Sequence, residues 1–179
     1  MIKELIPPNH LNYDVNRVTV RLAAIEHDSV VNGEGVRTVL YTQGCSHHCK
    51  GCHNPRTWDF EGGRQFSYNE ILKEVKQNKL SNGVTWSGGD PVYQENNVFL
   101  ISKELKLLGY NIWLYTGFTY EYLLKFKPLL LSVVDVLVDG MFELDKKTLE
   151  LPFVGSSNQR VIDVPTSFKE KRVKVLYRV

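Results

Sequence analysis

Long apolar runs and an excess of one charge are both missing from this sequence of 179 residues. Without a run of about 18 apolar residues, it offers no candidate for a membrane-spanning helix. The formal net charge is +2, which indicates no strong attraction to nucleic acid or to an anionic membrane. Internal repeats and low-complexity segments are missing too. We therefore expect one globular domain, with neither nucleic acid nor a membrane as its partner.

Cysteine is scarce as well, with three residues that all lie between positions 45 and 52. A disulfide framework would leave one of the three thiols unpaired. The first residues lack the apolar stretch of a signal peptide, so we expect a cytoplasmic protein whose thiols stay reduced. Cys45, Cys49 and Cys52 are therefore better explained as metal ligands.

Segments of strand pattern alternate with segments of helical pattern from about residue 18 onward. Strands are expected within 18–26, 36–44, 83–91, 110–118, 133–142 and 159–165, and helices within 67–80, 96–109 and 119–126. This order predicts an α/β protein built from βα units around a mostly parallel sheet. Because a closed eight-stranded barrel typically needs about 250 residues, we expect an open, partial βα barrel over 18–179, preceded by an N-terminal extension, 1–17.

The loops that follow the expected strands carry the residues of chemical interest. They are residues 44–58, 87–91, 116–118 and 139–141. In α/β folds such loops meet at the carboxyl edge of the sheet, where ligands bind. We therefore expect these four loops to form one site.

The cysteine spacing, C-x3-C-x2-C, narrows the choice of metal. Thiolates suit zinc, copper(I) and iron–sulfur clusters. A structural zinc site needs four ligands, and a histidine from the same segment would have to complete it. A 4Fe–4S cluster normally binds four cysteines, so three leave one iron open to a small molecule. Gly44 and Gly51 give the backbone the freedom to curl around such a centre.

The string NGEGVRTVLYTQGCSHHCKGCHNPRTW, residues 32–58, resembles the activating enzymes of glycyl radical enzymes, which belong to the radical S-adenosylmethionine superfamily. The resemblance implies an oxidoreductase in which Cys45, Cys49 and Cys52 hold one 4Fe–4S cluster. It implies that the open iron binds S-adenosyl-L-methionine, and that reductive cleavage gives a 5′-deoxyadenosyl radical. That radical takes a hydrogen atom from a glycine of a partner enzyme. A low-potential electron donor such as a flavodoxin is implied as well.

Two later segments, VLVDGMF at 136–142 and GSSNQRVI at 155–162, resemble the activating proteins of anaerobic ribonucleoside-triphosphate reductases. The resemblance covers roughly residues 18–162 and implies that such a reductase is the protein substrate. TWSGGDP, residues 85–91, resembles the Gly-Gly-acid loop of the superfamily. The residues that this likeness implies for binding S-adenosylmethionine are Ser87, Gly88, Gly89 and Asp90. Thr116 and Gly117 either line the ribose or form a plain turn.

Several interpretations stay open at this point. The same chemistry on another glycyl radical enzyme, such as pyruvate formate-lyase, is one, and a zinc-stabilised binding module without catalysis is another. By itself the Gly-Gly-Asp stretch also fits a tight turn in which Asp90 caps a helix that starts at Pro91.

We expect His47 and His48 to face solvent. We also expect Gly89→Val to weaken cofactor binding and to spare the cluster.

Overall fold

The computed structural model describes residues 13–177 of the chain. Most of the predicted N-terminal extension, 1–17, therefore lies outside the described residues. Its last part forms a short 3-10 helix, η1 (Val15–Arg17), and Tyr13 and Val15 pack against the core. The domain boundary itself stays a prediction. None of the helices in the described part of the chain is long and apolar enough to cross a bilayer.

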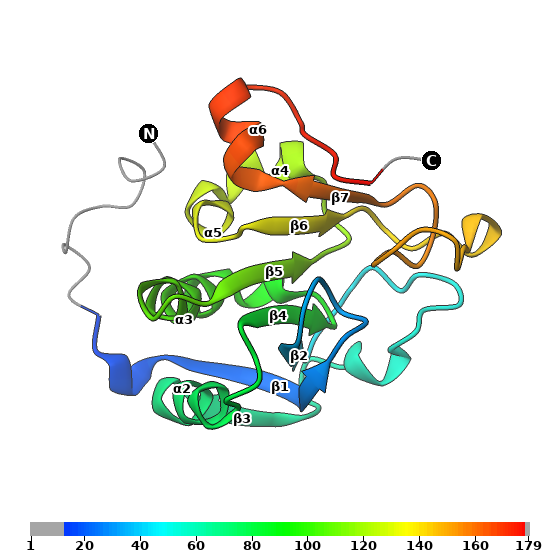
Figure 1. Ribbon diagram of the computed structural model, residues 1–179. Coiled ribbons are helices and arrows are strands. Elements are labelled where there is room, and N and C mark those ends of the chain that lie inside the picture. The colour runs from blue at the N-terminus through cyan, green and yellow to red at the C-terminus, as the bar shows by residue number, and fades with distance from the viewer. Residues whose placement is uncertain (1–12, 178–179) are drawn as a thin grey trace.

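Seven strands form one open sheet in the order β3-β1-β2-β4-β5-β6-β7 (Figure 1). The strands are β1 (Thr19–Ser29), β2 (Arg37–Thr42), β3 (Arg64–Ser67), β4 (Gly83–Gly88), β5 (Asn111–Tyr115), β6 (Val136–Asp139) and β7 (Arg160–Asp163). Strands β3 and β7 form the two edges and do not pair with each other. The predicted α/β class and open sheet are confirmed. The short edge strand β3 was not predicted, because its residues are mostly polar and none of the four is buried.

The sheet is less parallel than the sequence predicted. The pairs β2–β4, β4–β5 and β5–β6 are parallel, whereas β1–β2, β1–β3 and β6–β7 are antiparallel. Parallel neighbours need a crossover, and helices supply one after β2, β4 and β5. No α-helix separates β1 from β2 or β6 from β7, so these strands return antiparallel. The prediction of a mostly parallel sheet is therefore wrong at both flanks and right for the centre.

Helices pack on one face of the sheet, and their local signals follow the sequence closely. They are α2 (Tyr68–Gln77), α3 (Glu95–Leu107), α4 (Tyr120–Phe126), α5 (Pro128–Ser132) and α6 (Val164–Glu170). Ser67 and Glu70 form a capping box at the start of α2. Gly109 follows α3 with a φ of +90°. Pro128 does more than end the preceding helix, because it is the first residue of α5.

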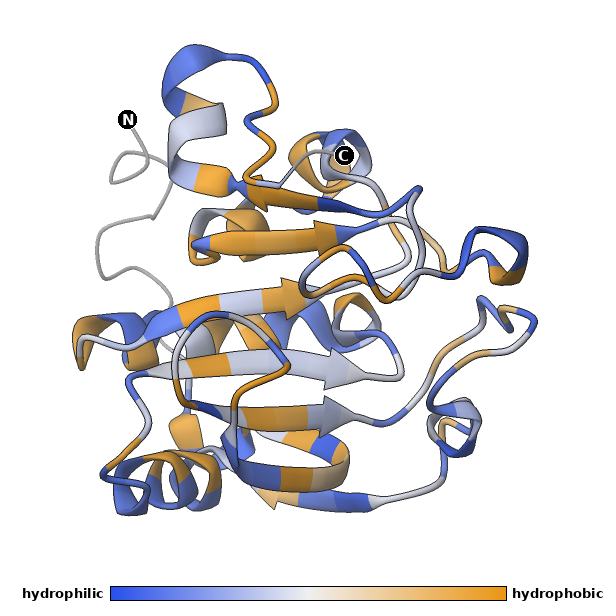
Figure 2. Cartoon of the chain, turned by 45° about the vertical axis from the view of Figure 1, so that its right-hand side comes forward, coloured by the Kyte–Doolittle hydropathy of each residue, from blue (hydrophilic) through white to orange (hydrophobic). Residues whose placement is uncertain are grey.

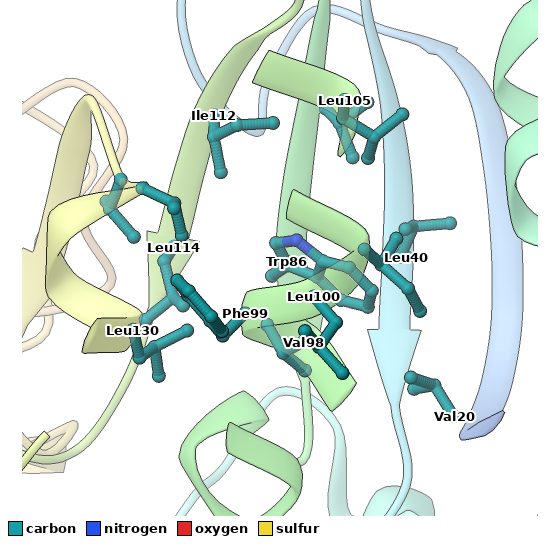
Figure 3. Close-up of a cluster of buried hydrophobic side chains, with 14 of the residues drawn as sticks. Val20, Leu40, Trp86, Val98, Phe99, Leu100, Leu105, Ile112, Leu114 and Leu130 are labelled. Atoms are coloured by element: carbon teal, nitrogen blue, oxygen red, sulfur yellow. The ribbon is translucent and has the colours of Figure 1, made fainter. Parts of the chain in front are cut away.

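The main core lies between the sheet and these helices. Figure 3 shows Leu40, Trp86 and Leu114 of the central strands against side chains of α3. Trp86 is fully buried and donates its indole N–H to Ser102 Oγ at 2.8 Å. Hydrophobic residues are concentrated along the strands, and the loops are more polar (Figure 2). Burial of this apolar face is the main force that holds the helices on the sheet.

The opposite, inner face of the sheet is closed at the amino ends of the strands by a buried arginine. Arg37 is 1% exposed and its guanidinium lies 5.3 Å from the centre of the Trp113 ring. It donates to Thr85 Oγ1 and to three backbone oxygens, those of Glu34, Val84 and Asn111, at 2.7–3.0 Å. Burial lowers the pKa of Arg37 to about 10, so it stays charged at neutral pH. We call Arg37 and Trp113 the floor plug.

The segment that joins β1 to β2 folds over this face and covers the plug. Gly33 has a φ of +126°, and a Cβ there would lie 2.8 Å from the Trp113 ring. At the other flank, Val175 in the segment after α6 bridges to Ile162 of β7.

Replacing Arg37 with methionine should lower the free energy of unfolding by about 3 kcal/mol, because buried acceptors lose their donor. Urea denaturation measures this change. Arg172→Met is the matched control, because this side chain is 77% exposed and, among the described residues, forms an ion pair with Glu170 alone. The control should change stability by less than about 1 kcal/mol. Equally small effects of both substitutions would contradict the structural role of the floor plug.

Candidate functional site

A pocket of about 460 Å³ lies at the carboxyl ends of the central strands. Its volume is within the usual range for small-molecule sites, about 300–1,000 Å³. The sequence-predicted residues that line it are Cys45, Cys49, Cys52, Ser87, Gly88, Gly89, Thr116 and Gly117. Gly140 and Met141 line it as well, so the structure brings together residues from all four loops, as the loop argument predicted. Asp90 does not line the pocket and lies behind its wall.

The segment 44–58, here called the cysteine loop, is closed at its stem by backbone hydrogen bonds. Gly44 N donates to Thr57 O at 2.8 Å, and Cys45 N donates to Trp58 O at 3.1 Å. Gly44 and Gly51 have φ values of +98° and +75°, a region that favours glycine. The loop therefore curls as its glycines predicted, and all its thiols reach one pocket.

The thiols suit a cluster better than a single ion. Among the described residues, no group of three or more His, Cys, Asp or Glu side chains is arranged to hold one metal ion. In a 4Fe–4S cluster each cysteine binds a different iron, so the sulfurs need not converge on one point. Burial is the main cause that raises the pKa of Cys45 and of Cys49. Without a metal these two thiols hold their protons at neutral pH, and metal binding would release them.

The Gly-Gly-Asp stretch is attached directly to the stem of the cysteine loop. Gly89 N donates to Thr42 O at 2.7 Å, and Asp90 N donates to Gly44 O at 2.9 Å. A Cβ on Gly88 would lie 2.6 Å from Thr42 N, and one on Gly89 would lie 2.5 Å from Gly44 O. Two backbones therefore approach too closely here for a side chain. The glycines are needed for that approach, whatever ligand the pocket binds.

The carboxylate of Asp90 joins the loops that surround the pocket. It is 1% exposed, and it accepts hydrogen bonds from Val92 N, Thr116 Oγ1 and Gly117 N at 2.9–3.0 Å. His47 Nε2 lies 2.9 Å from Asp90 Oδ2. Asp90 also caps the 3-10 helix η3 (Pro91–Gln94), as the plain-turn interpretation predicted. A direct contact with S-adenosylmethionine stays a prediction, and the structure gives Asp90 a positioning role.

His47 was expected to face solvent, and that expectation is wrong. Its side chain is 13% exposed, and its ring centre lies 4.7 Å from that of Phe118. A Cβ on Gly117 would lie 2.6 Å from the His47 ring. His48 is exposed as expected, with its ring centre 4.7 Å from that of Trp58. Two adjacent histidines look alike in the sequence, so only the distant partner Asp90 distinguishes them.

The β6–β7 connection packs against the cysteine loop and forms a further wall of the pocket. Its first residues, 139–141, were expected at the site, whereas the part after them was not predicted. The ring centre of His53 lies 4.9 Å from that of Phe142, and a Cβ on Gly51 would lie 2.8 Å from Leu144 Cδ1. Gln159 shapes this wall, because its side chain accepts from Gly155 N and donates to Gly140 O, at 2.9 and 2.8 Å. The two late segments that carried the resemblance, 136–142 and 155–162, meet in this wall.

Fold and site together define an α/β protein with three thiols in one pocket at the carboxyl edge of an open sheet. Residues 31–162 match the family model described as a 4Fe-4S single cluster domain. That match favours the iron–sulfur interpretation over the zinc module. A crystal structure of QueE from Escherichia coli shares the fold, with a TM-score of 0.50 and 14% identity over 57% of this chain and 55% of that one.

Curated relatives specify the family further. The protein from Pasteurella multocida is 36% identical over 140 residues, which span 73% of this chain and 89% of the relative. Those from Escherichia coli K12 and phage T4 are 34% and 36% identical, over 74% and 73% of this chain and 91% and 86% of their own. All three are called anaerobic ribonucleoside-triphosphate reductase-activating protein. The chain belongs to this family.

Gly89→Val should lower the iron content to roughly half or less, because the side chain displaces the stem of the cysteine loop. Its Cβ would lie 2.5 Å from Gly44 O and 2.9 Å from Thr57 O. This outcome replaces the expectation that the cluster would be spared. Iron per chain after anaerobic reconstitution is the measurement. Gly109→Ala is the control, since a Cβ there would meet no described atom within 4 Å, even though its φ of +90° strains the variant. Full iron in Gly89→Val would contradict the backbone contact.

His47→Ala should lower the free energy of unfolding by about 1–3 kcal/mol, because the buried Asp90 carboxylate loses one of its partners. The neighbouring exposed position provides the control, and His48→Ala should change stability by less than about 0.5 kcal/mol. Both variants keep three thiols and should keep their iron. Indistinguishable unfolding curves for the two variants would show that the His47–Asp90 contact does not contribute to the free energy of unfolding.

Proposed function

We propose that this protein activates an anaerobic ribonucleoside-triphosphate reductase by generating a glycyl radical on it. The observation that supports this most is the convergence of three thiols with the Ser-Gly-Gly and Thr-Gly turns on one pocket. An incomplete cysteine set in an open pocket suits a cluster that accepts a further ligand. The names of the relatives indicate the same reductase as partner.

The residues fit the proposed cofactors. Cys45, Cys49 and Cys52 would hold one 4Fe–4S cluster, and the turn at Ser87, Gly88 and Gly89 would hold the methionine part of S-adenosyl-L-methionine. Bound there, the two cofactors supply the 5′-deoxyadenosyl radical that removes a hydrogen atom from a glycine of the reductase. Thr116 and Gly117 would line the ribose, and Asp90 would keep their loop in place through its hydrogen bonds.

The open sheet suits a protein substrate. We interpret the sheet with its helices as a partial βα barrel of the radical S-adenosylmethionine type. The strands that a closed barrel would have in addition are missing, which leaves an entrance at the side for a loop of the reductase. Hydrogen-atom transfer needs no general base, so the chain's contribution is to hold, orient and shield. An electron must come from a low-potential donor such as a flavodoxin. A cytoplasmic location fits these reduced thiols.

The test is to mix the reconstituted protein anaerobically with S-adenosylmethionine, a reductant and the cognate reductase, and to record electron paramagnetic resonance spectra. A persistent glycyl radical is expected with the unchanged protein. Replacing any one of Cys45, Cys49 or Cys52 with alanine should remove both the iron and the radical, because two thiols do not hold the cluster. Lys50→Ala is the control, since Lys50 is exposed in the same loop.

Two outcomes would contradict the proposal. A cysteine variant with full iron and full radical yield would overturn the cluster assignment. A well-loaded protein that cleaves S-adenosylmethionine but leaves the reductase without a radical would overturn the choice of partner. Pyruvate formate-lyase would then be the next protein to test.

A further inference from the structure

The pocket has a second half that the cysteines and the glycine turns do not occupy. Beyond the cofactor residues, its lining includes Glu26, Asn32, Tyr41 and Tyr115. Tyr41 pairs with Ser87 in the β2–β4 register, and Trp86 pairs with Leu114 in the β4–β5 register. Ser87 and Tyr115, which follow that second pair, are therefore neighbours. Tyr41, Ser87 and Tyr115 thus form one row across the inner face of the sheet, one layer above the floor plug.

The two tyrosines of this row differ in their hydrogen bonds. Tyr41 donates its hydroxyl to Glu26 Oε2 at 2.7 Å and accepts from Asn32 Nδ2 at 3.3 Å. The hydroxyl of Tyr115 is buried and has no hydrogen-bond partner among the described residues. Burial is the main cause that raises the pKa of Tyr115, so its hydroxyl keeps its proton and remains a donor. A buried hydroxyl without a partner destabilises the protein, and a ligand that carries an acceptor would remove that cost.

Charge and shape indicate what that ligand is. Among the described residues that line the pocket, Glu26 carries a full negative charge. No lysine or arginine is among these lining residues. This lining favours a neutral or cationic ligand over a phosphate ester. Val31, at the rim, is 70% exposed, and Phe153 and Val154 add further apolar surface. A peptide main chain fits this surface, because it is uncharged and offers carbonyl acceptors and amide donors side by side.

We propose that Tyr115, with Glu26, Asn32 and Tyr41, binds the main chain of the partner segment that carries the radical glycine. In this arrangement the Tyr115 hydroxyl donates to a peptide carbonyl, and the Glu26 carboxylate and the Asn32 amide oxygen accept from peptide N–H groups. Glycine suits the row, because without a side chain its Cα can approach the tyrosine rings. Ser87 belongs to the same row, so the peptide would lie next to the cofactor residues. This inference rests on the proposed function.

The variant Tyr115→Phe tests this inference, because the substitution removes the hydroxyl and keeps the ring. The first readout is the affinity of the reconstituted protein, with S-adenosylmethionine bound, for a fluorescent synthetic peptide that spans the radical glycine of the reductase. Fluorescence anisotropy should show binding about tenfold weaker than in the unchanged protein. The second readout, the affinity for S-adenosylmethionine alone, should stay the same within about twofold. Tyr110→Phe is the matched control, because Tyr110 packs against the core outside the pocket.

The outcomes separate this inference from the proposed function. A Tyr115→Phe variant that loses affinity for S-adenosylmethionine would assign the hydroxyl to the cofactor and overturn the inference. Unchanged affinity for the peptide, or a peptide that the unchanged protein does not bind, would overturn it as well. The proposed function fails in a different way, when the unchanged protein forms no glycyl radical on the reductase.

Discussion

The buried carboxylate of Asp90 is the contact on which the candidate site depends. The loops after β2, β4 and β5 each contribute a partner to it, namely His47, Val92 and the Thr116–Gly117 turn. A buried carboxylate is costly unless several donors satisfy it, and here the donors come from separate parts of the chain. Satisfying that one group therefore fixes the three loops relative to one another. The cysteines and the glycine turns owe their common pocket to this arrangement.

The remainder of the inner face determines how deep the pocket is. The floor plug of Arg37 and Trp113 fills the amino end of the strands, and the row with Ser87 between two tyrosines lies one layer above it. The pocket therefore has its floor in the sheet and its walls in the cysteine loop and the β6–β7 connection. Because the sheet is open between β3 and β7, the architecture leaves one side without a strand. A small cofactor and a protein segment can then share one cavity.

Local patterns were sufficient to predict most of the elements and part of the site. The helices over 67–80 and 96–109 and the curl of the cysteine loop all depend on residues close together in the sequence, and all are confirmed. The placement of the glycine turns beside the thiols followed from the rule that loops meet at the carboxyl edge of a parallel sheet. The central strands obey that rule because helices supply their crossovers.

Contacts between distant residues could not be predicted in the same way. His47 lies 43 positions from Asp90, and nothing near His47 in the sequence indicates that it is buried. The antiparallel flanks depend on connections that lack a helix, and the Tyr115 hydroxyl becomes notable only when its lack of a partner is seen. The role of the glycines changed for the same reason. Their crowding against Thr42 and Gly44 arises from the meeting of two loops, which no local pattern contains.

The central claim is that this chain transfers a hydrogen atom from a glycine of the reductase to the cofactor held in its pocket. Reductase labelled with deuterium at the glycine Cα provides the most direct measurement. After anaerobic reaction with S-adenosylmethionine and a reductant, mass spectrometry of the released 5′-deoxyadenosine reports where the label went. The account predicts 5′-deoxyadenosine that carries deuterium, in proportion to the glycyl radical formed. Unlabelled 5′-deoxyadenosine alongside a full yield of radical would contradict it.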